Sequence, residues 1–189
     1  PYRVLYRLGK GGSSEVYAAT GPWAQRVALK MQRVPKKRQR FLQELDVLNH
    51  FNHPNLSPTL AFGIDVDGWS YLVMELIDGR SATSYSQSID RKERNAVAVG
   101  IAIEVADILG HLHRRGWIHG DVKSKNILID RRGRAHLIDF ELARPIEQTG
   151  RGKFFGTRSY APPEQHEGKK LSPAVDIYTL AGVLCRMIG

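Results

Sequence analysis

The 189-residue sequence contains only one cysteine, Cys185. A single cysteine excludes an internal disulfide framework, so a reducing compartment fits this composition best. Because Cys185 stands in an apolar stretch near the end of the chain, we expect it to be a buried, inert thiol.

Long apolar runs are missing as well. The longest candidate is AVAVGIAI, from Ala96 to Ile103, whereas a membrane-spanning helix needs roughly 20 apolar residues. We therefore expect no membrane segment in this chain. The sequence starts at Pro1 without a methionine, a basic leader or a hydrophobic signal segment, which suggests an excised domain.

Acidic residues are in deficit: 19 Asp and Glu oppose 28 Lys and Arg, which gives a formal net charge of +9. A protein this basic could bind nucleic acid, acidic lipid or another phosphate-rich ligand. The basic residues fall in short, separate clusters, and none is interleaved with the aromatics that stack on single-stranded nucleic acid. We expect no nucleic-acid partner.

The overall composition, with 42% hydrophobic and 25% charged residues, is typical of a soluble globular protein. The first third predicts strands around tight turns and one helix. Strands are predicted at Arg3–Leu8, Glu15–Ala19, Arg26–Met31 and Tyr71–Ile77, and the helix is predicted at about Lys37–Asn49.

The composition changes near residue 78. A serine-rich linker, Gly79–Ser88, precedes a long helix that ends near Gly116 and carries Ile101, Val105, Ile108 and Leu112 on one face. Two short apolar runs, Asn126–Asp130 and Ala135–Asp139, predict a hairpin. Ser172 and Pro173 occupy helix-start positions before a last apolar helix, whose Leu180, Val183 and Leu184 we expect to be partly uncovered.

A glycine-rich turn, GKGGSSEV from Gly9 to Val16, lies between the first two predicted strands. Glycines let backbone amides approach phosphate oxygens closely. Alone, such a segment is more often just a tight turn.

The next strand contains VALK, from Val27 to Lys30. Strand alternation turns Ala28 and Lys30 to the same face, where a small residue leaves room for a flat ring and an ammonium can reach phosphates. A buried ammonium needs a partner, and Glu44 in the predicted helix can supply the carboxylate. The alternative is a surface lysine and a surface glutamate.

Two further segments complete a pattern: IHGDVKSKN, Ile118–Asn126, and IDFELAR, which contains Asp139. Together with GxG, VALK and the helical glutamate, they resemble the eukaryotic-type (Hanks-type) protein serine/threonine kinases, including bacterial members, over essentially the whole chain. The resemblance implies that Asp121 is the catalytic base and that Asn126 and Asp139 hold the metal.

By the same resemblance, Lys123 steadies the transferred phosphoryl group, and Lys30 paired with Glu44 orients the phosphates. The implied cofactors are ATP and Mg²⁺, with Mn²⁺ as a possible substitute. Leu48, His119 and Phe140 are expected to stack as an apolar column. The residues implied to bind the nucleotide are Gly9, Lys10, Gly11, Gly12, Ser13, Ser14, Val16, Ala28, Lys30, Met74, Glu75, Leu76 and Leu128.

The implied fold is α+β and two-lobed, a small antiparallel sheet lobe plus a mainly helical lobe, with ATP at the hinge. We expect an N-terminal lobe at residues 1–74 with a five-stranded sheet and one helix, a hinge at 75–78, and a C-terminal lobe at 79–189. Because the family's domain continues through several more helices, that lobe is expected to be incomplete, ending within or just after its central helix.

Two later motifs favour a protein as the acceptor. GTRSYAPPE, from Gly156 to Glu164, resembles the peptide-docking end of the activation segment, and DIYTLAG, from Asp176, resembles the central helix whose aspartate holds the catalytic loop. Phosphotransferases of the aminoglycoside and choline kinase type often share the HGD loop but lack this pair. The resemblance therefore implies cytoplasmic transfer of phosphate from ATP to Ser or Thr of a protein substrate, which the sequence does not identify, and it leaves the oligomeric state open.

Three departures from the family pattern matter. Gly120 replaces the arginine that normally neutralises an activation-loop phosphate, so activity is expected not to depend on such a phosphate. Glu141 stands where a glycine is usual and Pro162 where an alanine is usual. A pseudokinase, or a nucleotide-binding scaffold with little catalysis, is therefore the alternative to an active enzyme.

Overall fold

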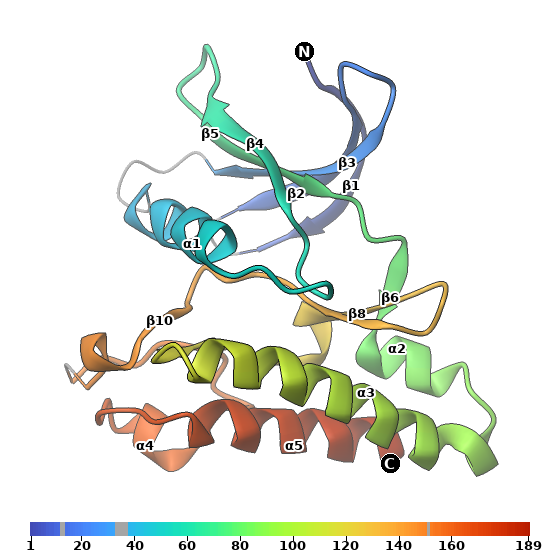
Figure 1. Ribbon diagram of the computed structural model, residues 1–189, viewed down its shortest axis with the longest axis vertical. Coiled ribbons are helices and arrows are strands. Elements are labelled where there is room, and N and C mark those ends of the chain that lie inside the picture. Colours follow the sequence, from blue (N-terminus) through green and yellow to red (C-terminus); the bar gives the residue numbers. More distant parts are fainter. Residues whose placement is uncertain (12–13, 33–37, 151) are drawn as a thin grey trace. The chain divides into compact units, whose positions relative to one another are not determined.

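The computed structural model describes residues 1–11, 14–32, 38–150 and 152–189 (Figure 1). Its contacts divide the chain into two units. Unit 1 comprises Pro1–Asn52 and Ser57–Ile77, and unit 2 comprises His53–Leu56 and Asp78–Gly189. The first unit is built on an antiparallel sheet and the second is mainly helical, so the predicted α+β class is confirmed.

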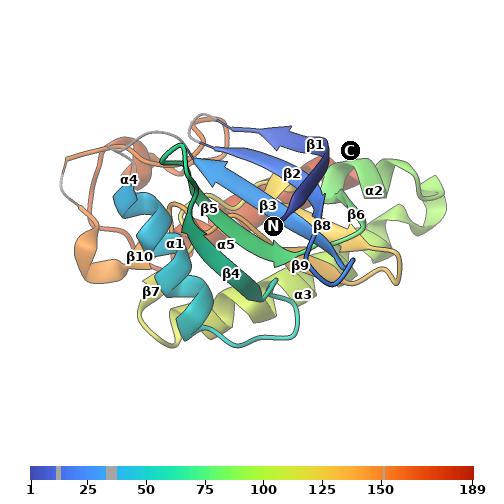
Figure 2. The ribbon, with the colours of Figure 1, turned by 90° about the horizontal axis from the view of Figure 1, so that it is seen from above.

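Unit 1 contains a five-stranded antiparallel sheet in the order β1-β2-β3-β5-β4, with the helix α1 against it (Figures 1 and 2). The four predicted strands and the helix are confirmed within a few residues. The pattern of TLAFGI did not predict β4, because its apolar side chains alternate with small residues and are exposed. The elements are β1 (Arg3–Lys10), β2 (Glu15–Thr20), β3 (Arg26–Gln32), α1 (Arg38–His50), β4 (Thr59–Ile64) and β5 (Ser70–Glu75).

The strand register separates the two faces of this sheet. Directly paired residues share a face, so the pairing of Lys30 with Val16 and Leu72 places all three side chains on one side. Helix α1 packs on that side, because Leu45 and Leu72 form a buried cluster. The opposite face has its own apolar cluster, formed by Ala19, Val27, Leu29 and Val73.

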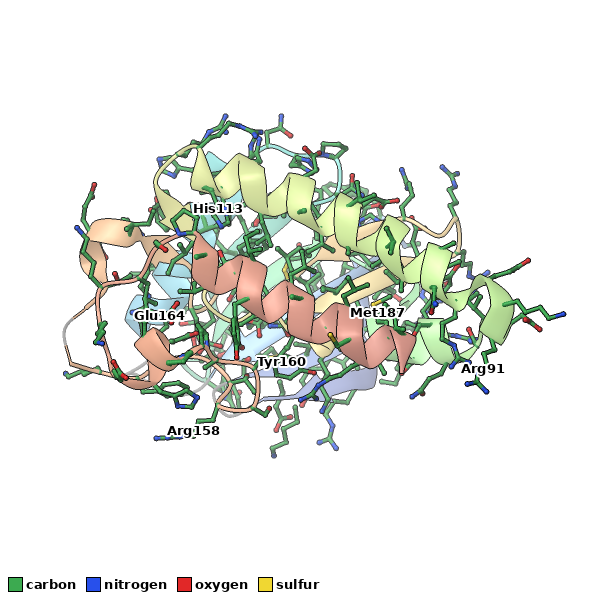
Figure 3. The ribbon with its side chains drawn as sticks, turned by 90° about the horizontal axis from the view of Figure 1, so that it is seen from below. Arg91, His113, Arg158, Tyr160, Glu164 and Met187 are labelled. Atoms are coloured by element: carbon green, nitrogen blue, oxygen red, sulfur yellow. The ribbon has the colours of Figure 1, made fainter. Side chains whose placement is uncertain are left out.

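Unit 2 is organised around two helices, α3 and α5, which run side by side (Figures 1 and 3). Asp90 caps the start of α3 by accepting a hydrogen bond from the Lys92 amide at 2.8 Å. The helices and strands of unit 2 are β6 (Gly79–Ser81), α2 (Ala82–Gln87), α3 (Arg91–His113), β7 (Trp117–Ile118), β8 (Ile127–Asp130), β9 (Ala135–Leu137), β10 (Arg144–Pro145), α4 (Pro163–His166) and α5 (Ala174–Ile188).

Most predicted elements of unit 2 are present. The predicted apolar face of α3 is buried, and β8 pairs with β9 as the expected hairpin. The serine-rich segment differs from the prediction, since it forms β6 and α2 instead of a linker. Ser81 explains the difference, because its hydroxyl caps α2 by accepting from the Ser84 amide.

Helix α3 is, by length and composition, long and apolar enough to cross a membrane, and it contains the AVAVGIAI run. One such helix is weak evidence, because the core helix of a soluble protein passes the same test. In this fold Ile101, Val105, Ile108 and Leu112 of α3 are buried, and the helix packs against α5, β7 and β9.

Two predictions about α5 are wrong. Leu180 and Val183 are buried, whereas Leu184 is half-buried as expected, and Cys185 is exposed. The helical period explains both results, since Leu180, Val183 and Met187 recur every three to four residues on the face toward α3, whereas Cys185 falls on the outer face.

Asp130 fixes the turn of the β8–β9 hairpin. Its side chain accepts hydrogen bonds from the amides of Arg132 and Arg134 and from the side chains of Arg134 and His136. Burial raises the pKa of Asp130, but these hydrogen bonds outweigh the burial and lower the pKa from 3.8 to about 2.

The lowered pKa predicts a pH-dependent stability. The ionised carboxylate stabilises the fold above about pH 4, and this contribution is lost as the pH falls toward 2. Asp130→Asn should therefore lower the free energy of unfolding at pH 7 by about 2 kcal/mol. The difference from wild type in urea unfolding should shrink toward pH 2. Asp67→Asn, at an exposed turn, is the matched control, and a difference that does not change with pH would contradict this role.

Candidate active site

Lys30 and Glu44 form a buried ion pair in unit 1. The Lys30 Nζ lies 2.8 Å from Oε1 and 2.7 Å from Oε2 of Glu44, and the two residues are 6% and 1% exposed. Strand β3 presents the lysine and α1 presents the glutamate. Two charges this deeply buried stabilise the ionised form of each other, so the ammonium keeps a fixed position on the sheet. The predicted pairing is confirmed by these distances.

Four of the predicted nucleotide-binding residues, Gly9, Val16, Ala28 and Met74, lie on the sheet face that carries Lys30. Ala28 pairs with Met74, and Gly9 pairs with Val16, so their positions lie on this side of the sheet. Ala28 has no side chain beyond Cβ, which leaves space for a flat ring beside the ammonium. This grouping supports the predicted adenine-binding surface, whose role stays a prediction.

The glycine-rich turn is described only in part. Gly12 and Ser13 lie outside the described residues. The Gly11 amide donates to the Ser14 carbonyl at 2.8 Å, and Lys10 forms an ion pair with Glu15 at 2.9 Å across the hairpin. A side chain at Gly9 would meet no other atom within 4 Å, so its backbone is open to a ligand.

The predicted hinge contacts of Glu75 are partly engaged inside unit 1. Its amide donates to the Pro58 carbonyl at 3.3 Å, and its carbonyl accepts from Ser57 Oγ at 3.0 Å. A carbonyl oxygen has a second lone pair, so the Glu75 carbonyl can still accept a bond from a base. Leu76 follows β5 and is half-buried.

Asp176 holds the loop that contains Asp121, as the sequence predicted. The Asp176 side chain is fully buried and accepts hydrogen bonds from the amides of His119 and Gly120, each at 2.8 Å. Its Oδ2 also lies 2.8 Å from the His113 Nε2. The helix α5 therefore fixes the backbone immediately before Asp121, and no local pattern predicted the contact with His113.

The Asp121 carboxylate is held by two side chains. The Thr157 hydroxyl donates to Oδ1 at 2.7 Å, and the Lys123 ammonium donates to Oδ2 at 2.5 Å. Lys123 also donates to the Thr157 hydroxyl at 3.2 Å. The predicted base and the predicted phosphoryl-stabilising cation thus lie together, with a threonine of the activation segment beside them. A carboxylate in this arrangement can accept a proton from a hydroxyl presented next to Thr157.

Asn126 and Asp139, the predicted metal ligands, are linked through the backbone. The Ile138 amide donates to the Asn126 carbonyl at 2.9 Å, which fixes the residue before Asp139 beside the loop. The Asn126 side chain donates to the Asp121 carbonyl at 3.0 Å through Nδ2, so Oδ1 is its atom for binding a cation.

Asp139 has a left-handed backbone with φ of +66°. A non-glycine residue in this region is strained, and such strain concentrates at functional sites. An amide oxygen and a carboxylate are ligands that suit Mg²⁺, which keeps water and phosphate oxygens as its other ligands. No group of three or more His, Cys, Asp or Glu side chains within the described ranges could hold a metal by itself.

Two of the three residues of the predicted apolar column, His119 and Phe140, contact each other in unit 2. The rings of His119 and Phe140 lie 4.9 Å apart in an edge-to-face arrangement, and both residues are buried. The Asp121 amide donates a hydrogen bond to the His119 Nδ1. The ring proton is therefore on Nε2, which faces the Ile138 carbonyl. Leu128 is half-buried in β8, and Leu48 belongs to unit 1, where it packs against the cluster of Leu45 and Leu72.

The comparison with known families agrees with this geometry. The model of the protein kinase domain matches residues 2–189. The chain belongs to the protein kinase family.

The curated relatives are kinases of the serine/threonine type. The DNA damage-responsive serine/threonine-protein kinase RqkA of Deinococcus radiodurans is 33% identical, over 98% of this chain and 29% of its own length. The serine/threonine-protein kinase PknD of Mycobacterium tuberculosis is 34% identical, over 97% and 29%. The probable serine/threonine-protein kinase PknB of Corynebacterium glutamicum is 34% identical, over 99% and 31%.

The predicted Hanks-type serine/threonine kinase family is thereby confirmed. The chain spans about 30% of the length of these relatives. Kinases of this family generally use ATP and Mg²⁺.

Glu141 is compatible with the kinase fold. Ala24 and Asp139 are the non-glycine residues with positive φ in the described part of the chain, so Glu141 adopts a backbone that tolerates a Cβ. The backbone at position 141 therefore does not require a glycine.

The activation segment offers few hydroxyls for a regulatory phosphate. Thr149 is buried, donates to the Ile146 carbonyl at 2.7 Å and accepts from the Leu171 amide at 2.9 Å. Ser159 is exposed, and Thr157 is bonded to Asp121. Thr149 is therefore a structural residue, and a phosphate on its oxygen would break both hydrogen bonds.

We predict that Thr149→Ala and Ser159→Ala each retain most of the kinase activity, because Gly120 provides no cation for a phosphate. Thr149→Ala should lower the free energy of unfolding by about 1 kcal/mol through the lost hydrogen bonds, whereas Ser159→Ala should not. Initial rates per folded molecule and urea unfolding check this. Near-complete loss of activity in Ser159→Ala would refute it.

Proposed function

We propose that this chain catalyses transfer of the γ-phosphoryl group of ATP to serine or threonine hydroxyls of proteins. The observation that carries the proposal is the Asp121 carboxylate held between Lys123 and Thr157. A carboxylate fixed beside a cation and an activation-segment threonine suits a base that accepts the proton of an incoming hydroxyl.

In the proposed reaction, Asp121 accepts the proton as the acceptor oxygen forms a bond to the γ-phosphorus. The bond from that phosphorus to the β,γ-bridging oxygen breaks, and ADP leaves with the electron pair. Lys30, held by Glu44, orients the phosphates, and Lys123 stabilises charge on the transferred group. Asn126 and Asp139 would hold Mg²⁺, which neutralises the charge of the phosphate oxygens when it is bound.

The nucleotide would lie against the sheet face described above. We propose Val16, Ala28 and Leu128 as contacts of the adenine ring, Met74 at the back of its pocket, and the backbones of Glu75 and Leu76 as its hydrogen-bonding partners. Residues 9–14 would approach the phosphates. Mn²⁺ is a chemically reasonable substitute for Mg²⁺, since both prefer oxygen ligands. A cytoplasmic location, where ATP is available, follows from this function.

The proposal is tested by incubating the full-length protein with γ-labelled ATP, Mg²⁺ and a degenerate peptide mixture. We expect label on phosphoserine and phosphothreonine, and none on kanamycin or choline offered as acceptors. Label on a small molecule with none on peptides would assign the chain to the small-molecule phosphotransferases. Saturable nucleotide binding without transfer to any acceptor would make it a pseudokinase.

A further inference from the structure

The activation segment of this kinase lacks the usual means of being fixed by phosphorylation. Residues 150–156, GRGKFFG, contain no hydroxyl group. The preceding hydroxyl, on Thr149, is buried and bonded on both sides. Gly120 replaces the arginine that would pair with a phosphate, so another interaction has to hold this segment against the catalytic loop.

Gln165 makes such an interaction. The residue lies in α4 and is 2% exposed. Its side-chain Nε2 donates to the Gly120 carbonyl at 2.9 Å and to the Phe155 carbonyl at 2.6 Å. One neutral amide therefore joins the residue before the proposed base to the activation segment.

The glycines around this amide have no room for side chains. At Gly156, with φ of +111°, a Cβ would lie 2.5 Å from the Gln165 Nε2. At Gly120, with φ of +77°, a Cβ would lie 3.0 Å from the Phe155 ring. Gly120 thus permits both the close approach of Phe155 and the left-handed backbone.

A cation also contacts the activation segment, where it stacks on an aromatic ring. The guanidinium carbon of Arg144 lies 3.7 Å from the centroid of the Phe155 ring, and Arg144 Nε donates to the Leu142 carbonyl at 3.0 Å. Stacking of this kind can fix the ring without a phosphate on the activation segment.

The segment that Gln165 and Arg144 hold leads directly to Thr157, which is bonded to the proposed base, and to Arg158, which is labelled in Figure 3. We propose that Gln165 is a positioning residue that, with the stack of Arg144 on Phe155, replaces activation-segment phosphorylation in this kinase. This inference rests on the proposed function. Gln165 acts through the Gly120 and Phe155 carbonyls, and it does not touch the substrate.

The test is Gln165→Glu, which preserves shape but removes both donors and sets a carboxylate against two carbonyl oxygens. Gln148→Glu, at an exposed glutamine of the same segment, is the matched control. With phosphatase-treated full-length protein, we expect kcat/KM for a peptide substrate to fall about 30-fold, while KM for ATP changes less than about twofold. A role in stability alone would lower the amount of folded protein and leave KM for the peptide unchanged.

The pH dependence of the activity of Gln165→Glu further separates a positioning role of Gln165 from a role in packing alone. Burial against two carbonyls would raise the pKa of the introduced carboxyl, and its protonated form can donate one hydrogen bond. The activity of Gln165→Glu relative to wild type should therefore rise as the pH is lowered from 8 to 6. The Gln148→Glu ratio should stay flat.

Limited trypsin digestion tests whether Gln165 holds the activation segment, and it does not depend on kinase activity. Cleavage after Lys153 and Arg158, both exposed, should be several times faster in Gln165→Glu than in wild type. Faster cleavage of Gln165→Glu, together with no phosphoryl transfer by wild type, would support the positioning role of Gln165 and refute the proposed function. Wild-type rates of both digestion and peptide phosphorylation in Gln165→Glu would overturn the inference.

Discussion

Asp121→Asn should lower the rate of phosphoryl transfer about 10³-fold, the size expected when a general base is removed. The carboxylate lies within 2.7 Å of the Thr157 hydroxyl and 2.5 Å of the Lys123 ammonium, so it is placed to take a proton from an acceptor hydroxyl. An asparagine keeps the shape and can still accept from Thr157, but it cannot take up the proton at neutral pH.

Initial rates with a saturating peptide and labelled ATP measure this effect. Nucleotide affinity should change little, because Asp121 is proposed to act on the acceptor and not on ATP. Asp67→Asn, at the exposed turn between β4 and β5, should keep the wild-type rate. A rate for Asp121→Asn above a tenth of wild type would show that the carboxylate is not the base.

Lys30→Met should lower kcat about 10²-fold, because the ammonium that we propose stabilises charge on the phosphates is removed. The same change leaves the Glu44 carboxylate buried without its cation, and breaking a buried pair in this way costs about 3 to 5 kcal/mol of stability. Unfolding in urea and transfer rates per folded molecule should therefore both show large losses.

The double variant Lys30→Met with Glu44→Gln separates the two effects. Removing the orphaned charge should restore most of the free energy of unfolding, but the transfer rate should stay low. Lys92→Met, at an exposed position on α3, should match wild type in both measurements. Recovery of the transfer rate together with stability would show that Lys30 has only a structural role.

The sequence predicted which side chains of β3 share a face, because successive side chains of a strand point to opposite faces. Ala28 and Lys30 share a face since they are two residues apart in β3, and Glu44 reaches Lys30 because one amphipathic helix packs on that face. The bond from Asp176 to the catalytic loop was implied by the family resemblance, and two hydrogen bonds confirm it. The catalytic and binding roles of these residues stay predictions.

Tertiary contacts without a local pattern could not be predicted. Gln165 follows the APPE motif with no periodic or compositional signal, and only the fold brings its amide to the carbonyls of Gly120 and Phe155. The contact of His113 with Asp176 joins residues 63 positions apart. The apolar composition around Cys185 predicts a buried thiol, whereas the helical period of α5 places Cys185 on the exposed face.

Residues 53–56 show the same limit. Sequence continuity placed them with residues 1–74, whereas in the structure they belong to unit 2. Asn55 explains this placement, since its side chain donates to the Ala135 carbonyl at 2.7 Å and its carbonyl accepts from the Leu137 amide. A hydrogen bond between residues 80 positions apart leaves no trace in local composition.

The central proposal is that Lys30 and Asp139 both take part in phosphoryl transfer from the nucleotide. A double-mutant cycle with Lys30→Met, Asp139→Asn and the combined variant, measured as kcat with ATP and Mg²⁺, tests it most directly. Residues that act as one catalytic unit are strongly non-additive, so the combined loss should be close to the larger single loss. A combined loss equal to the product of the two single losses would show that these residues act independently and would contradict the account.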